Sequence, residues 1–162
     1  MPAPSINLNR ACLARRMMEF GVRPHLIAYM MKLPEPSVME WYEQVIGKRP
    51  NRGPLKNCAA SYIKTRSDAR RLAVFCTFYR KAKRTAGPMM MEQLFLAMAH
   101  FNKIYPDQKI DGTLAWMAAR EFDTNVLRFK YCSSCRLHYL YYLQSPQLRK
   151  CPFCPSRCRK SC

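Results

Sequence analysis

Four cysteines near the C-terminal end of the sequence form two C-x-x-C pairs, Cys132/Cys135 and Cys151/Cys154, with fifteen residues between the pairs. A C-x-x-C turn places two thiolates on one side of a tight backbone turn, at the separation that two corners of a Zn²⁺ tetrahedron require. The two pairs therefore predict a single site with four thiolates and one zinc ion. Because four thiolates leave no coordination position for water, we expect this ion to be structural. Two disulfides are the alternative interpretation of the spacing.

The segment between the two pairs is typical of a strand followed by a turn. Residues 137–143 read Leu-His-Tyr-Leu-Tyr-Tyr-Leu, a run of aromatic and aliphatic side chains that favours extended backbone. Ser145 and Pro146 then provide the residue types of a return turn. We therefore expect a zinc ribbon in the order knuckle, strand, turn, strand, knuckle, where a knuckle is the turn formed by one C-x-x-C pair.

Three further potential ligands lie near these pairs. His138 follows Cys135 by three residues and could replace a thiolate or hydrogen-bond to one. Since the two knuckles already supply a complete ligand set, we expect His138 to be a partly exposed strand residue. Cys158 and Cys162 lie in the basic tail, and we expect free thiols there.

The composition is that of a folded protein from a reducing compartment. The chain has 162 residues, of which 49% are hydrophobic, and nine cysteines. An odd number of cysteines, together with an N-terminus that lacks a basic region followed by an apolar run, argues against a secreted disulfide scaffold. No stretch approaches eighteen apolar residues, so no membrane span is expected. We predict a cytoplasmic protein with metal-bound cysteines.

The net charge of +18 is unevenly distributed along the sequence. Residues 1–88 carry 17 basic and 5 acidic side chains, residues 89–126 carry 3 and 5, and residues 127–162 carry 8 and none. The two basic regions favour binding to a polyanion. The nearly neutral region between them favours packing or binding to a protein partner. Nucleic acid is the favoured polyanion, with anionic lipid and an acidic protein as the alternatives.

The first part of the chain predicts three short helices. Asn9 is expected to cap a helix over residues 10–20 that Gly21 ends, and a second helix begins at Pro24. After Leu33 and Pro34, a third helix follows over residues 35–46. This arrangement resembles a helix-turn-helix.

The third helix has the wrong charge for contacts with phosphates. Its outward positions include Glu35, Glu40 and Glu43, and it contains no lysine or arginine. Carboxylates are repelled by phosphates, although a glutamate can accept a hydrogen bond from cytosine. A role in the major groove and a purely structural role both stay open for this helix.

Residues 48–66 and the helix that follows form the predicted phosphate-binding surface. Prolines and glycines place the charges of residues 48–66 on a loop, from which they can reach phosphates. Ser67 is expected to cap a helix through Arg84 with one basic side. The candidate DNA-binding residues of this surface are Lys48, Arg49, Arg52, Lys56, Lys64, Arg66, Arg70, Arg80 and Lys81.

Two more helices are expected, over residues 89–104 and over residues 113–127 with Thr113 as cap. No glycine-rich phosphate loop, nucleophile motif or paired catalytic carboxylates appear in the sequence, so we predict that the protein is not an enzyme. The fold class is mainly α. A helical domain spans residues 1–127, including the helix-turn-helix-like trio at 10–47, and a zinc ribbon with a basic tail spans 128–162.

These elements carry a resemblance to a known family. Its most specific parts are the helix that contains Trp116, the following Tyr131-Cys132-Ser-Ser-Cys135, and Cys151-Pro-Phe-Cys154. From about residue 10 to residue 158 the chain resembles the FlhC family, the zinc-containing subunit of the bacterial flagellar master regulator. The resemblance implies a mainly helical fold in which the four knuckle cysteines hold one Zn²⁺.

The same resemblance implies partners and a function. The partner would be FlhD, a small helical protein, in a hetero-oligomer with several copies of each subunit. The complex would bind and bend double-stranded DNA upstream of flagellar class II promoters and recruit RNA polymerase as a transcription activator. The competing hypothesis is a zinc-ribbon RNA-binding or ribosome-associated protein, in which Tyr139, Tyr141 and Tyr142 stack on unpaired bases.

Overall fold

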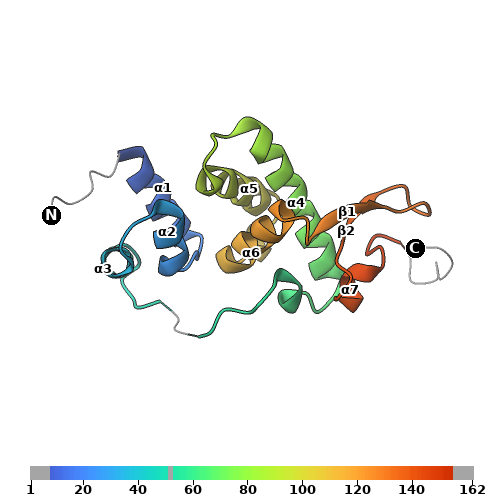
Figure 1. Cartoon of the computed structure of the whole chain (residues 1–162), viewed down its shortest axis with the longest axis horizontal. Helices are drawn as coiled ribbons and strands as arrows, with labels where there is room; N and C mark the ends of the chain where they lie inside the picture. The colour runs from blue at the N-terminus through green and yellow to red at the C-terminus, as the bar shows by residue number, and fades with distance from the viewer. Residues whose placement is uncertain (1–7, 51–52, 155–162) are drawn as a thin grey trace.

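The computed structural model describes residues 8–50 and 53–154, and within them the protein is mainly helical. The chain is arranged along one long axis (Figure 1), with three helices at one end, three further helices in the middle and a small β-hairpin at the other end. The mainly α fold class is therefore confirmed. No helix of the described ranges is long and apolar enough to cross a membrane.

The N-terminal trio consists of α1 (Leu8–Glu19), α2 (Pro24–Met31) and α3 (Glu35–Ile46). Pro24 occupies the first turn of α2, where its fixed φ suits a helix, and Gly47 ends α3 with a φ of 74°. The predicted bounds of these two helices are confirmed. The prediction of Asn9 as a cap is wrong, because α1 begins at Leu8 and Asn9 lies inside the helix.

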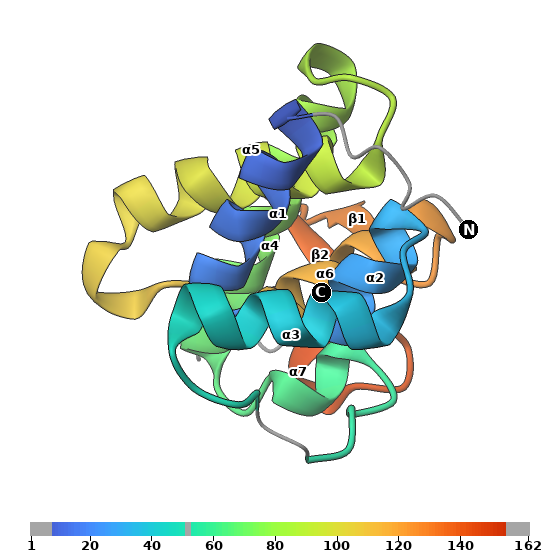
Figure 2. The same ribbon diagram turned by 90° about the vertical axis from the view of Figure 1, so that its left-hand side faces the viewer.

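Helix α3 lies on the outer side of the trio, in front of α1 and α2 in Figure 2. Val38 is its only fully buried side chain, while the aromatic and aliphatic side chains that follow are half-buried. Glu35, Glu40 and Glu43 are all exposed, as their outward positions predicted. The outer face of this helix is therefore acidic.

The centre of the molecule is built by α4 (Arg66–Thr85), α5 (Met90–Ile104) and α6 (Gly112–Asp123), which pack against one another. The largest side chains without exposed surface come from all three helices, and the rings of Phe75 and Phe101 meet edge to face at 6.3 Å. This apolar cluster continues into the N-terminal trio through Met17, Met18 and Ile27. One core therefore joins the trio to the central helices.

The starts of the central helices differ from the prediction. Thr65, not Ser67, caps α4: its hydroxyl accepts from the Asp68 N–H at 3.1 Å, and the Asp68 carboxylate accepts from the Thr65 N–H at 2.9 Å. This reciprocal pair satisfies two backbone donors and fixes the start of the helix. Asp111, not Thr113, caps α6 by accepting from the Leu114 N–H at 2.9 Å.

Helix α6 also ends earlier than predicted, at Asp123 instead of Leu127. Asn125 has a φ of 59°, in the left-handed region that asparagine tolerates better than most residues. The N–H groups of Val126 and Leu127 both bond to the carbonyl of Glu121, which closes the helix. The chain leaves the helix there and forms a strand from Arg128 onward.

The ribbon contains β1 (Arg128–Tyr131), β2 (His138–Tyr141) and the short helix α7 (Pro146–Arg149). The two strands pair antiparallel, with Arg128 opposite Tyr141 and Tyr131 opposite His138. The predicted strand before the turn exists, but its partner precedes the first knuckle, and a helical turn replaces the expected second strand. Pro146 explains this replacement, since it is favourable in the first turn of a helix.

Candidate metal centre and basic surface

The first knuckle connects the two strands of the hairpin. The Cys132 N–H donates to the carbonyl of Leu137 at 2.9 Å, and the Arg136 N–H donates to the carbonyl of Cys132 at 2.8 Å. Arg136 has a φ of 57°, which the tight turn requires. These contacts point the thiols of Cys132 and Cys135 toward the second knuckle, which follows α7.

The four Sγ atoms of Cys132, Cys135, Cys151 and Cys154 all lie within 4.8 Å of one another. Two of these separations are 3.4 Å, from Cys132 to Cys154, and 3.5 Å, from Cys135 to Cys151. A tetrahedron with Zn–S bonds of 2.3 Å has S···S edges of about 3.8 Å, whereas a disulfide bond measures about 2.05 Å. The geometry therefore fits four ligands around one ion.

The donor set also matches a structural ion. Three of the thiols are buried and Cys135 is half-buried. Burial raises the pKa of the Cys151 thiol, the N–H groups of Phe153 and Cys154 lower it, and the neighbouring thiols of Cys135 and Cys132 raise it. A bound cation would displace these protons, since a metal ligand must be the thiolate.

Other potential ligands lie apart from this cluster. Within the described residues, the group of His, Cys, Asp and Glu side chains close enough to hold a metal consists of the four cysteines alone. His138 is exposed on β2 and its ring lies 5.3 Å from that of Tyr131, as expected for a strand residue. Cys158 and Cys162 lie outside the described residues.

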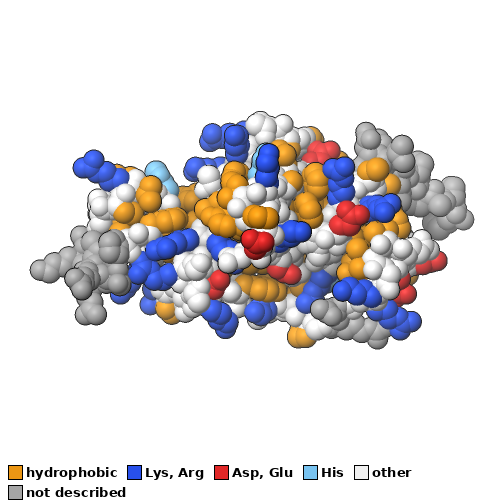
Figure 3. All heavy atoms as spheres, turned by 180° about the vertical axis from the view of Figure 1, so that it is seen from behind, with side chains coloured by type: hydrophobic (Ala, Val, Ile, Leu, Met, Phe, Trp, Pro, Cys, Tyr) orange, Lys and Arg blue, Asp and Glu red, His pale blue; other side chains and the backbone are white. Residues whose placement is uncertain are grey.

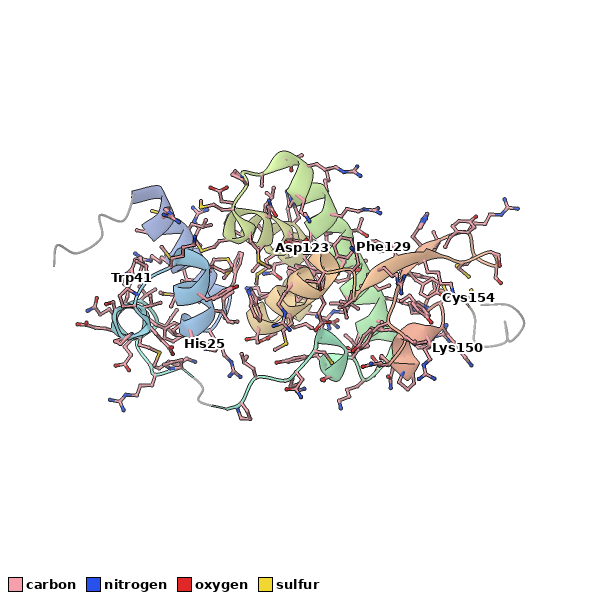
Figure 4. The ribbon with its side chains drawn as sticks, in the orientation of Figure 1. His25, Trp41, Asp123, Phe129, Lys150 and Cys154 are labelled. Carbon is pink, nitrogen blue, oxygen red and sulfur yellow. The ribbon has the colours of Figure 1, made fainter. Side chains whose placement is uncertain are left out.

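Helix α4 holds the second knuckle in place. The Nε of Arg70 donates to the carbonyl of Pro152 at 2.6 Å. The guanidinium of Arg66 donates to the same carbonyl at 3.2 Å and also to that of Cys154. In Figure 4, Cys154 and Lys150 lie at the ribbon end of the molecule, far from His25 and Trp41. Two arginines predicted to bind phosphates therefore already contact the backbone around the cluster of four cysteines.

The remaining predicted DNA-binding residues are spread over the molecule. Arg49 forms an exposed ion pair with Glu43 at 3.4 Å, Lys56 lies 4.1 Å from the ring of Tyr62, and Arg80 lies 4.7 Å from that of Phe129. Three lysines are simply exposed: Lys48 after α3, Lys64 before α4 and Lys81 on α4. Arg52 lies outside the described residues.

The loop that carries Lys56 and Lys64 is attached to the helical core by a buried carboxylate. One oxygen of Glu121 accepts from the Ala59 N–H at 3.0 Å, at the start of η1 (Ala59–Tyr62). Burial raises the pKa of Glu121, while the Ala59 N–H and Arg120 lower it. This contact joins two segments 62 residues apart and was not predicted.

The ribbon contributes exposed cations that were not among the predicted DNA-binding residues. All five of its basic residues within the described ranges are exposed: Arg128, Lys130, Arg136, Arg149 and Lys150. Residues 127–154 contain no acidic residue. In Figure 3 the left-hand end of the molecule, where the ribbon lies, shows Lys and Arg but no acidic side chain on that face. The sequence signal that could have identified these five cations is the charge of residues 127–162, which contain basic but no acidic residues.

The tyrosines of the ribbon are less accessible than the RNA hypothesis requires. Tyr139 is 1% exposed and packs against the thiol cluster. Tyr141 is half-buried, with the Lys130 amine 4.7 Å from its ring, and Tyr142 is half-buried as well. The ring of Tyr139 therefore cannot stack on a base in this structure.

Comparison with known proteins identifies the family. Among curated proteins, none matches the chain. The family described as "Flagellar transcriptional activator (FlhC)" matches residues 5–162. This match covers nearly the whole sequence and agrees with the mainly helical fold and the cluster of four cysteines. The chain therefore belongs to the FlhC family of flagellar transcriptional activators, which are regulators of transcription and not enzymes.

Proposed function

We propose that this protein is a zinc-stabilised DNA-binding subunit of a transcription activator. It acts in the cytoplasm with an FlhD-like protein in a hetero-oligomer, binds promoter DNA of flagellar class II operons and recruits RNA polymerase. The observation that carries the proposal is the ribbon: a compact, entirely cationic unit around four clustered thiols, in a chain of this activator family.

Cys132, Cys135, Cys151 and Cys154 are the proposed ligands of one Zn²⁺ ion. Their separations suit a tetrahedron, and four thiolates leave no open position for a water molecule. The ion would supply folding free energy to a unit that has little apolar core of its own. Its role is to hold the cationic side chains of the ribbon in a fixed arrangement.

The proposed DNA contacts fall into two groups with different roles. Cations contact phosphates; among the predicted residues these are the exposed Lys48, Arg49, Lys56, Lys64, Arg80 and Lys81, together with Arg52, which lies outside the described residues. Arg66 and Arg70 form the second group and position the second knuckle through its carbonyls. The exposed cations of the ribbon are further proposed phosphate contacts.

An apolar hollow supports a protein partner at the opposite end of the molecule. It has a volume of about 780 Å³ between α2 and the start of α5. Its lining is apolar at Met30, Leu33, Met89 and Met90, with Arg10, His25, Lys32 and Glu35 as the charged or titratable members. Tyr29 lies at this hollow with 73% of its surface exposed. An apolar helix of an FlhD-like protein fits this chemistry, because aromatic and methionine side chains are enriched where proteins associate.

The test is the salt dependence of DNA binding by the purified hetero-oligomer. We expect the logarithm of the association constant for a promoter duplex to fall with the logarithm of salt concentration, with a slope of about −0.9 per contacted phosphate. Lys81→Glu should weaken binding on all sequences alike and make the slope shallower. Lys103→Glu, on α5 in the neutral part of the chain, is the matched control. A salt-independent affinity, or a preference for single-stranded RNA over duplex DNA in competition, would refute the proposal.

A further inference from the structure

The tip of the β-hairpin exposes two large side chains beside the first knuckle. Tyr131 is 54% exposed and Leu137 is 48% exposed. We use the name hairpin tip for Tyr131, Arg136, Leu137 and His138. In Figure 1 this end of the hairpin extends away from the helices. An exposed leucine alone is ordinary, but here an exposed leucine and tyrosine occur together at a protruding end.

The strand register explains why these side chains are not covered. Tyr131 and His138 are directly opposite each other, on the same face of the hairpin as the pair Phe129 and Leu140. Leu140 is buried in the core, and the ring of Phe129 packs edge to face on that of Phe122 at 5.6 Å. The inner pair is therefore anchored on the helical body, whereas Tyr131 and His138 lie beyond it.

The hairpin tip has a fixed backbone. The hydrogen bonds across the first knuckle join the backbone of Cys132 to that of Leu137 and Arg136. The thiol of Cys132 is itself 3.4 Å from that of Cys154 on the second knuckle. Because this backbone is already ordered, little conformational entropy is lost when the apolar side chains of the tip enter a binding site.

The charge around the hairpin tip indicates what it binds. Arg136 belongs to the tip, while Arg128 and Lys130 alternate with Phe129 and Tyr131 along β1, and all three cations are exposed. No acidic residue lies anywhere in residues 127–154. An apolar tip on a ribbon whose charged residues are all cations complements a stack of bases between two phosphate backbones.

We propose that Leu137 and Tyr131 enter the minor groove of duplex DNA and insert against a base step, with Arg136 and Lys130 on the adjacent phosphates. This inference rests on the proposed function, since it names the part of the DNA that the ribbon contacts. Apolar side chains that insert between base steps unstack them and kink the duplex. The hairpin tip is therefore the element of this chain that deforms DNA, and the other cations hold the DNA backbone.

The experiment uses the full-length chain in its hetero-oligomer and a promoter duplex with 2-aminopurine at successive positions. The wild type should raise 2-aminopurine fluorescence at one step, and energy transfer between labelled ends should report a bend there. Leu137→Ala and Tyr131→Ala should lose the fluorescence increase and reduce the bend. Affinity should fall about 5- to 150-fold, the range for removal of one side chain stacked on a base. The salt slope should not change, because no cation is removed.

Two variants serve as controls. Leu143→Ala removes a leucine that is 63% exposed on the same ribbon, outside the hairpin tip, and should leave both signals intact. Leu137→Met keeps an apolar side chain of similar length and should retain the bend. Metal content and circular dichroism of each variant show that the ribbon is folded.

The outcomes separate this inference from the proposed function. If Leu137→Ala and Tyr131→Ala bind and bend DNA like the wild type, the insertion is refuted while salt-dependent binding stands. If they lose transcription activation with the bend unchanged, the hairpin tip contacts a protein such as RNA polymerase, and the insertion is again refuted. A wild-type hetero-oligomer that does not bind duplex DNA would overturn both proposals.

Discussion

The helical body and the ribbon are stabilised by different means. In the body, the buried cluster draws on every helix from α1 to α6 and includes fully buried aromatic rings such as Phe75, Tyr79 and Phe101. The ribbon's own cluster consists of Tyr139 and the buried thiols of Cys132, Cys151 and Cys154, with few half-buried neighbours. The body thus has a hydrophobic core, whereas the centre of the ribbon is a cluster of cysteine thiols around one tyrosine ring.

This difference follows from size. A unit of fewer than about 40 residues buries too little apolar surface to offset its conformational entropy and generally needs a metal or disulfides. Residues 128–154 are below that limit. The ribbon adds Leu140 and Leu148 to the core of the body, and Arg66 and Arg70 hold its second knuckle. On the proposed function, its fold therefore depends on a metal ion and on docking, whereas the body has a hydrophobic core of its own.

Removal of the metal is the strongest test of this contrast. Cys154→Ser, or treatment with a chelator, should unfold the ribbon and abolish DNA binding while the helical circular dichroism remains close to that of the wild type. The expected effect is large, because structural zinc sites contribute about 10–16 kcal/mol in small zinc-binding peptides. Metal analysis and amide hydrogen exchange across residues 128–154 measure it.

The matched control for this variant is Cys12→Ser, which changes an exposed cysteine on α1. It should keep one metal ion per chain and full amide protection in the ribbon. Retention of ribbon protection in metal-free Cys154→Ser would show that docking alone suffices, and the contrast between the two regions would disappear.

The next largest effect is expected in the body. Phe75→Ala removes a ring with no exposed surface and should lower the free energy of unfolding by about 3–5 kcal/mol. Because the cluster is continuous, urea denaturation should show one shifted transition for all helices. Phe78→Ala, at a half-buried position one turn further along α4, should have a smaller effect. A loss confined to the ribbon would contradict the assignment of this core.

The third test concerns the junction between the two regions. Arg70→Ala removes the closer of the two donors to the Pro152 carbonyl. A hydrogen bond from a charged group contributes about 1.5–3 kcal/mol. Hydrogen exchange should accelerate around the second knuckle and stay unchanged in α5 and α6. Arg84→Ala, which removes an exposed arginine near the other end of α4, is the control. Equal effects of the two substitutions would mean that Arg70 acts only through its charge.

The elements that the sequence predicted well are those fixed by local chemistry. Pro24 and Gly47 delimit α2 and α3 through their own backbone preferences, and a C-x-x-C spacing needs no information from elsewhere in the chain. Strand β1 was missed because none of its side chains is fully buried, so no clear alternation marks it, and because the helix before it was predicted to run through Leu127. Its pairing depends on β2, which is separated from it by the first knuckle.

The roles of Arg66 and Arg70 could not be predicted from the sequence, because they too depend on contacts with a distant segment. An arginine that donates to a backbone carbonyl leaves no pattern in residue types, and its partners lie more than 80 residues away. Sequence-based analysis correctly located positive charge on α4. It could not separate the cations directed toward solvent from those directed toward the protein's own backbone.

The smallest expected effect comes from the cap of α4. It tests whether the start of this helix must be ordered for α4 to hold the second knuckle. Thr65→Ala removes the hydroxyl that accepts from the Asp68 N–H and should cost about 0.5–2 kcal/mol, whereas Ser67→Ala, inside the first turn, should change little. Arg66 is the first residue of α4, so fraying of this turn also displaces its guanidinium from the Pro152 and Cys154 carbonyls. Thr65→Ala should therefore accelerate hydrogen exchange in the second knuckle as well as in α4. Faster exchange in α4 alone would show that the ribbon is held by Arg70 and its apolar contacts without help from Arg66.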